Sequence, residues 1–181
     1  MRRGFHCLLL WTLVSSAAFT TSGCDIIEAT EDTILLPATT VELCFRFERT
    51  STSQELTVVS EASASLARYL QNEGYSTADV VTATITEGDL RFAFPLNETF
   101  ALFEEADIRL RAGGREASVL RSWSGSNTRS MILDVNETQD VGAIVSASSF
   151  EGVLVHTGAR STDGMLEVML TLVVQLEVQG V

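Results

Sequence analysis

Apolar and polar residues alternate with a period of two along most of the chain. In the last segment, apolar side chains occupy every second position from Leu166 to Val178, and the same pattern runs from Val41 to Phe47. Successive side chains of a strand point to opposite faces of a sheet, so these segments are predicted to be β-strands with one buried face.

Shorter strands are predicted between these two, separated by polar or glycine-containing turns. They cover residues 56–59, 81–85, 90–94, 108–111, 119–123, 131–135 and 153–157. At Gly88-Asp89 the apolar residues change parity, which indicates either a tight turn or a bulge. Phe100, Leu102 and Phe103 are expected to fill the core from a connecting segment.

One helix is predicted near residues 61–73, and residues 140–146 allow one further helical turn. Gly74 is expected to end the helix, and Ser60 or Ser63 can cap its start. Its apolar face, at helical spacing, comprises Ala62, Leu66, Tyr69 and Leu70.

About nine strands and one short helix predict a mainly all-β domain. The expected architecture is an antiparallel β-sandwich of jelly-roll or immunoglobulin-like topology. A parallel α/β fold would need a helix between successive strands, and only one such helix is predicted.

The N-terminal segment has the anatomy of an export signal. Arg2 and Arg3 precede an uncharged, largely apolar stretch over residues 7–19, and small residues then lead to Thr21-Ser22-Gly23-Cys24. This order of a positive region, a short apolar region and small residues is typical of a secretory signal peptide.

The cysteine after the small residues resembles the lipobox of bacterial lipoproteins. Gly23 and Ser22 match that pattern, whereas Thr21 stands where the family usually has leucine. The resemblance implies cleavage before Cys24 and a diacylglyceryl group on its thiol. Two alternatives remain open: ordinary cleavage, for example after Ala18, and an uncleaved anchor, although the stretch is shorter than the ~20 residues that span a bilayer.

These features divide the chain into three parts. Residues 1–23 are predicted to be the signal peptide, 24–38 a lipidated cysteine with an acidic tether, and 39–181 the β-sandwich domain. The expected location is outside the cytoplasm, attached by lipid to an inner or outer membrane. Asp25 is an inner-membrane retention signal only in some bacteria and does not decide between the two.

The charge balance excludes some partners. The chain has no lysine, and after residue 23 ten arginines stand against 24 acidic residues, a formal charge of −14. A GC-rich genome or adaptation to high salt would explain this composition. Such a surface argues against nucleic acid as a partner and against electrostatic docking on anionic lipid.

The cysteine and histidine content argues against the common catalytic and zinc sites. Cys44 is the one cysteine in the predicted sandwich and lies on the polar face of its strand. It could form a disulfide with Cys24 only if the signal peptide were removed by ordinary cleavage, without a lipid on Cys24. His156 is the one histidine after residue 23. No Gly-x-Ser-x-Gly motif occurs, and one histidine with one cysteine does not build a zinc site. We therefore expect no enzyme activity.

Two further groups of residues are candidates for ligand binding. Calcium is the candidate cofactor besides the covalent lipid, because it binds oxygen side chains such as those at alternate positions here. The spacing departs from an EF-hand loop, and a strand end followed by a helix cap is the other interpretation. These residues are Asp134, Asn136, Thr138 and Asp140.

Trp123 is the single tryptophan after residue 23 and is followed by a polar loop that includes Asn127. It is interpreted either as a core residue or, with Asn127, as a platform that stacks a sugar ring. The sequence thus predicts a non-catalytic lipoprotein of the cell envelope that acts as a structural or protein-interaction module. The alternative is a module that binds a carbohydrate or another small ligand through the Trp123 loop.

Overall fold

A computed structural model describes residues 32–48, 53–59, 62–158 and 164–180. The helical elements are α1 (Ala62–Asn72), η1 (Thr77–Asp79), η2 (Phe100–Leu102) and α2 (Gly142–Val145). The strands are β1 (Thr33–Leu35), β2 (Thr39–Glu48), β3 (Ser53–Val59), β4 (Val80–Phe94), β5 (Glu105–Ala112), β6 (Arg115–Ser118), β7 (Leu120–Ser122), β8 (Ser130–Ile132), β9 (Asp134–Val135), β10 (Glu151–Thr157) and β11 (Met165–Gln179).

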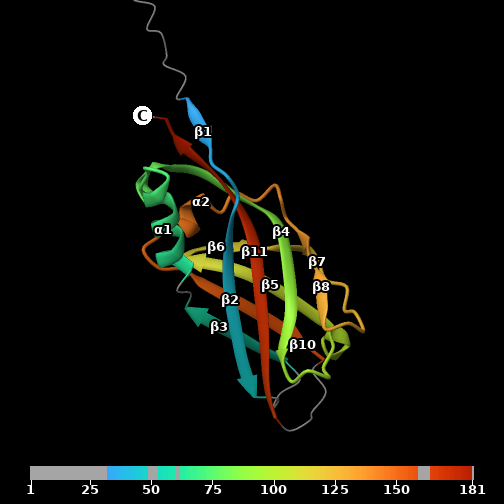
Figure 1. Ribbon diagram of the computed structural model, residues 1–181. Helices are drawn as coiled ribbons and strands as arrows, with labels where there is room; N and C mark the ends of the chain where they lie inside the picture. The colour runs from blue at the N-terminus through green and yellow to red at the C-terminus, as the bar shows by residue number, and fades with distance from the viewer. Residues whose placement is uncertain (1–31, 49–52, 60–61, 159–163, 181) are drawn as a thin grey trace, which may run out of the picture. The chain divides into compact units, whose positions relative to one another are not determined.

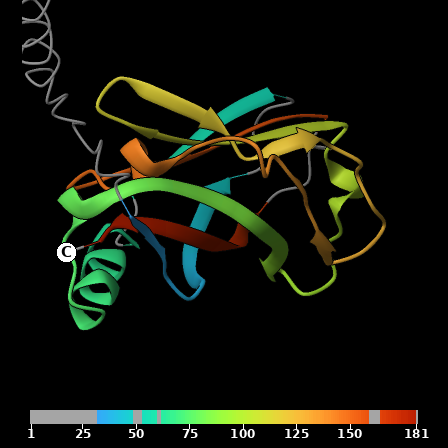
Figure 2. The ribbon, with the colours of Figure 1, turned by 90° about the horizontal axis from the view of Figure 1, so that it is seen from above.

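The strands form a mainly antiparallel β-sandwich, as the alternation predicts. One sheet has the order β2–β11–β4–β8, with β1 also paired to β11, and the other has the order β3–β10–β5–β6. Figures 1 and 2 show the two sheets as separate layers. Eight strands that alternate between two sheets in these orders make a jelly roll, which is one of the two topologies expected from the sequence.

The core lies between the two sheets. Side chains at every second position of β11, from Leu166 to Val178, are 0–1% exposed, so the longest alternating segment of the sequence is also the centre of its sheet. Gly152 on β10 faces β2, where a Cβ would lie 2.8 Å from Leu43 Cδ1 and 3.3 Å from Phe45 Cζ. A larger residue at this point would therefore force the side chain of Leu43 to shift.

Helix α1 packs against the first sheet near β2. Leu66 and Leu70 are buried, and the Tyr69 hydroxyl donates a 2.5 Å hydrogen bond to the carbonyl of Pro37. Gly74 follows the helix with φ +89°, and the amide of Tyr75 bonds to the carbonyl of Leu70 at 2.8 Å. This confirms Gly74 as the residue that ends the helix, because a left-handed φ is favourable there only for glycine. Ser60 and the side chain of Ser63 lie outside the described structure.

The predicted tether over residues 24–38 is wrong in its second half. Thr33–Leu35 forms β1, in which Thr33 pairs with Gln179 and Leu35 with Glu177. Three residues carry too little alternation to reveal a strand, and the pairing partner lies at the other end of the sequence. The sandwich therefore begins near Asp32, not at Thr39.

The parity change near Gly88 is a bulge within one continuous strand, β4. The register against β11 shifts between the pairs Ile85–Val174 and Glu87–Val173, so the tight turn is wrong and the bulge is confirmed. A second shift places Phe94 opposite Glu167, and Phe94 is 55% exposed. The alternation of Leu90, Phe92 and Phe94 in the sequence predicts that Phe94 shares the buried face, and this prediction is also wrong.

Within the described residues, no helix is long and apolar enough to cross a membrane.

Candidate functional site

Trp123 lies at the edge of the core, where the chain leaves β7. Its ring contacts Phe100 and Phe103, with centroid distances of 6.0 and 6.1 Å, and its Nε1 donates a long hydrogen bond of 3.4 Å to the Phe103 carbonyl. The side chain is half-buried. Trp123 thus packs against the core on one side while part of it remains accessible to solvent.

The accessible side of Trp123 borders an open depression of about 360 Å³, the Trp123 depression. Its floor consists of neighbouring residues of β5 and β10, which pair as Glu105 with Thr157 and Asp107 with Val155. The residues that line it are Glu105, Ala106, Asp107, Trp123, Val155, His156 and Thr157. They combine an aromatic ring, two carboxylates and a hydroxyl, the groups that contact small polar ligands.

Gly125 allows the loop after Trp123 to fold closely against the core. A Cβ at this position would lie 2.9 Å from the carbonyl oxygen of Phe103 and 3.3 Å from Trp123 Nε1. The first distance is shorter than real side chains tolerate, and the obstacle is backbone. Gly125 therefore helps to fix the position of Trp123.

The structure does not place Asn127 beside Trp123 in the depression. Its side chain is exposed, and its Oδ1 accepts a 3.2 Å hydrogen bond from the hydroxyl of Thr99. Asn127 is not among the residues that line the depression. The loop therefore brings Asn127 to Thr99, in the segment before η2, and its role in ligand binding stays a prediction.

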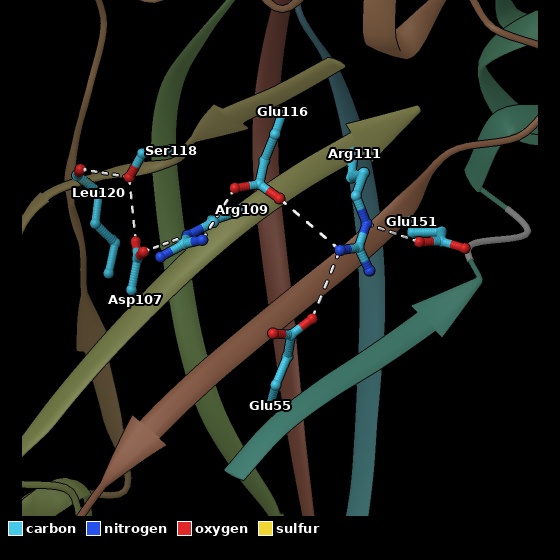
Figure 3. A network of polar contacts seen from close by, with 8 residues as sticks. All are labelled: Glu55, Asp107, Arg109, Arg111, Glu116, Ser118, Leu120 and Glu151. Atoms are coloured by element: carbon cyan, nitrogen blue, oxygen red, sulfur yellow. Dashed lines mark hydrogen bonds and ion pairs between the residues drawn. The ribbon is translucent and has the colours of Figure 1, made fainter. Parts of the chain in front are cut away.

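A network of ion pairs crosses the outer face of the second sheet next to the depression (Figure 3). Arg109 pairs with Asp107 and, at 2.9 Å, with Glu116. Arg111 lies 3.0 Å from Glu151, 3.6 Å from Glu55 and 3.9 Å from Glu116. Arg109 and Arg111 are thus paired locally with carboxylates, as is common for arginines on an acidic surface.

His156 lies inside the sandwich, on the inner face of β10. Its side chain is 1% exposed, and its ring centroid is 4.8 Å from that of Phe103 and 5.2 Å from that of Phe47. Burial lowers the pKa of the imidazole, and no described residue hydrogen-bonds to either ring nitrogen. His156 therefore behaves as a neutral aromatic core residue.

The four candidate calcium ligands do not converge on a point. Asp140 Oδ1 accepts hydrogen bonds from the amides of Ala83 at 3.0 Å and Gly142 at 2.8 Å, so this carboxylate joins β4 to the start of α2. Asp134 accepts from the Ser122 hydroxyl at 2.9 Å. The Thr138 hydroxyl donates to the side-chain oxygen of Asn136. These oxygens hydrogen-bond within the protein. No group of three or more acidic, histidine or cysteine residues that could hold a metal ion occurs within the described structure.

Cys44 lies on the outer face of β2, and its thiol donates a 3.3 Å hydrogen bond to Glu167 on β11. Burial and the Glu167 carboxylate raise the pKa of the thiol, although Arg46, 3.0 Å from Glu167, opposes this effect. Cys44 is thus held in its unreactive protonated form. Cys24 and the predicted signal peptide lie outside the described residues.

Sequence reasoning missed most residues of the depression. Glu105 and Asp107 alternate outward on β5, and Val155 and Thr157 alternate outward on β10. The alternation indicates that these side chains face outward, but the pairing of β5 with β10 is not contained in the local sequence. Of the residues that line the depression, Trp123 is the one that the sequence indicates as part of a ligand-binding site.

No protein-family model matches this sequence, and comparison with curated proteins finds no significant match.

Proposed function

We propose that the protein is a non-catalytic interaction module of the bacterial cell envelope, carried outside the cytoplasm on a lipid attached to Cys24. The sequence before Asp32 supports the lipid. The sandwich supplies a rigid body that the tether holds at one end, at β1.

The observation that carries this proposal is that the tether and Trp123 lie toward opposite ends of the sandwich. The chain enters the sandwich at β1, which pairs with the last residues of β11. Trp123 instead lies near the level of the first residues of β11. Phe103 links these positions, since its ring lies 6.1 Å from Trp123 and 6.3 Å from Phe47, which pairs with Leu166. The tethered end and the exposed aromatic side chain are therefore separated by roughly 30 Å along β11.

The location of His156 supports a non-catalytic role. A histidine that acts as a general base must reach its substrate and needs a partner that orients its ring. His156 instead packs between Phe47 and Phe103. In that position the imidazole serves the packing of the core.

Fractionation of cells tests the lipid attachment and the display. The wild-type protein is expected in the membrane fraction, and Cys24→Ala is expected to leave it. Cys44→Ala is the matched control, because it also removes one thiol and should leave the protein in the membrane fraction. A Cys24→Ala protein that fractionates like the wild type would contradict the proposal.

The Trp123 depression favours a second candidate function, the binding of a carbohydrate or another small ligand. A sugar ring could stack on the accessible part of Trp123 while its hydroxyls donate hydrogen bonds to Glu105 and Asp107. The proposal requires Trp123 to be partly accessible, and its side chain is half-buried rather than closed off.

Titration of Trp123 fluorescence with soluble peptidoglycan fragments tests this second function. Binding is expected to change the emission saturably, and Glu105→Gln should weaken it. Asn127→Ala is the control, because Asn127 lies outside the depression. Emission that stays constant for the wild type, or that responds equally in the Glu105→Gln and Asn127→Ala variants, would argue against a ligand at this site.

A further inference from the structure

We propose that the end of the sandwich formed by β1 and the start of β4 rests on a lipid bilayer, with Ile34, Leu35 and Val81 in contact with the lipid. This inference rests on the proposed lipidation of Cys24. It adds an orientation and a second membrane contact to the anchor.

The three residues are exposed apolar side chains at one end of the first sheet. Leu35 is 61% exposed, and Ile34 and Val81 are each 42% exposed. On one side of β11, Ile34 pairs with Val178 and Leu35 pairs with Glu177. On the other side, the same two residues of β11 pair with the β4 residues that precede and follow Val81. β1 and the start of β4, which carry these residues, therefore flank the end of β11 from both sides (Figure 1).

The short segment between Cys24 and β1 is the reason to expect a lipid bilayer at this surface. Eight residues lead from Cys24 to Asp32, and they span at most about 29 Å. A lipid on Cys24 would therefore hold the β1 end close to the bilayer. The exposed Phe94 and Leu96 are near the other end of β11, about 35 Å away along the strand.

Charge determines the kind of bilayer that fits. Asp32 is exposed beside β1. Glu177 lies between Leu35 and Thr82, and its carboxylate accepts a 3.1 Å hydrogen bond from the Thr82 hydroxyl. These carboxylates and the negative domain oppose an anionic surface. The contact is therefore apolar, with an uncharged or zwitterionic lipid surface, and adds to the affinity that the acyl chains provide.

Quenching by brominated lipid tests the orientation. The lipidated full-length protein is reconstituted in vesicles of phosphatidylcholine with brominated acyl chains, which quench tryptophan on contact. Leu35→Trp in a Trp123→Phe background reports on the proposed contact. Leu96→Trp in the same background is the matched control, since Leu96 is 68% exposed and lies toward the opposite end.

The emission of the Leu35→Trp reporter is expected to fall, while the Leu96→Trp reporter and wild-type Trp123 keep theirs. If the protein remains on the vesicles and the two reporters are quenched equally or not at all, the orientation is wrong although the anchor is correct. A protein that carries no lipid and leaves the vesicles would overturn both proposals. If the Trp123→Phe background does not fold, both reporters are placed in the wild-type background, and the emission of the wild-type protein is subtracted from theirs.

Discussion

His156 and Phe103 lie ring against ring in the core, with their centroids 4.8 Å apart and their planes inclined by 37°. Phe103 also contacts Trp123, and both His156 and Trp123 are among the residues that line the Trp123 depression. This arrangement connects the protonation of a core residue to the stability of the whole sandwich and to the environment of Trp123.

The free energy of unfolding is expected to decrease as the pH falls from about 7 to about 5. The imidazole of the unfolded chain binds a proton near pH 6.5, whereas burial lowers the pKa of folded His156. The unfolded state therefore binds more protons in this range, and the slope is at most about 1.4 kcal/mol per pH unit. Denaturant unfolding followed by Trp123 emission measures it.

The substitution His156→Phe is the control for this pH dependence. It keeps an aromatic ring beside Phe47 and Phe103 but removes the titrating group. The variant should show a flatter profile between about pH 7 and about pH 5, above the range in which ordinary carboxylates titrate. Equal slopes for both proteins would show that His156 is not the responsible group.

Gly152→Ala is expected to destabilise the sandwich by about 1–3 kcal/mol, because the new methyl group overpacks the space between the sheets. Its Cβ would lie 2.8 Å from Leu43 Cδ1. Thermal unfolding of the variant measures the loss, and Ser148→Ala at an exposed position is the control. A Gly152→Ala protein as stable as the wild type would mean that the two sheets are further apart than described.

Cys44 should react slowly with iodoacetamide at neutral pH. Burial first, and then Glu167, raise the pKa of its thiol, so the thiolate forms only at higher pH than in a free cysteine. Glu167→Gln should shift the pH profile of alkylation downward, and Arg46→Gln should shift it upward. A profile that is unchanged in both variants would contradict the contact between Cys44 and Glu167.

The domain should become more stable as salt rises from dilute buffer to molar concentration. Salt weakens the ion pairs of Figure 3, but these pairs are exposed and each contributes at most about 1 kcal/mol. With a formal charge of −14 from residues 24–181, screening of self-repulsion is the larger effect. Melting temperatures that do not change with salt would rule out adaptation of this surface to high salt.

Arg111→Gln separates the two effects of salt. At low salt it should destabilise the protein more than Arg121→Gln, which changes the charge equally but removes no ion pair identified among the described residues. The difference should decrease in molar salt. If the two variants are equally stable in dilute buffer, the network in Figure 3 contributes nothing measurable.

The sequence predicts the sandwich because its longest strands have one buried and one exposed face. The alternation from Leu166 to Val178 corresponds to β11, and Gly74 ends α1 for a local steric reason. Both signals are contained in a few consecutive residues. The strand order that selects a jelly roll depends on pairs such as β2–β11, which are far apart in the chain and leave no local pattern.

The parts that differ from prediction depend on such distant contacts. β1 is a strand only because Thr33–Leu35 reaches the end of β11, and Phe94 turns outward only because β4 contains bulges against that strand. The depression has the same origin, since the outer faces of β5 and β10 meet beside Trp123. Asn127 follows Trp123 closely in the sequence, but its loop turns toward Thr99.

The intact mass of the mature protein from its native host tests the lipid anchor most directly. A chain that begins at Cys24 and carries the added mass of a diacylglyceryl group is the predicted result, and Cys24→Ala should lack that addition. A wild-type mass that corresponds to an unmodified chain with another N-terminus, and with the same N-terminus in Cys24→Ala, would contradict the account.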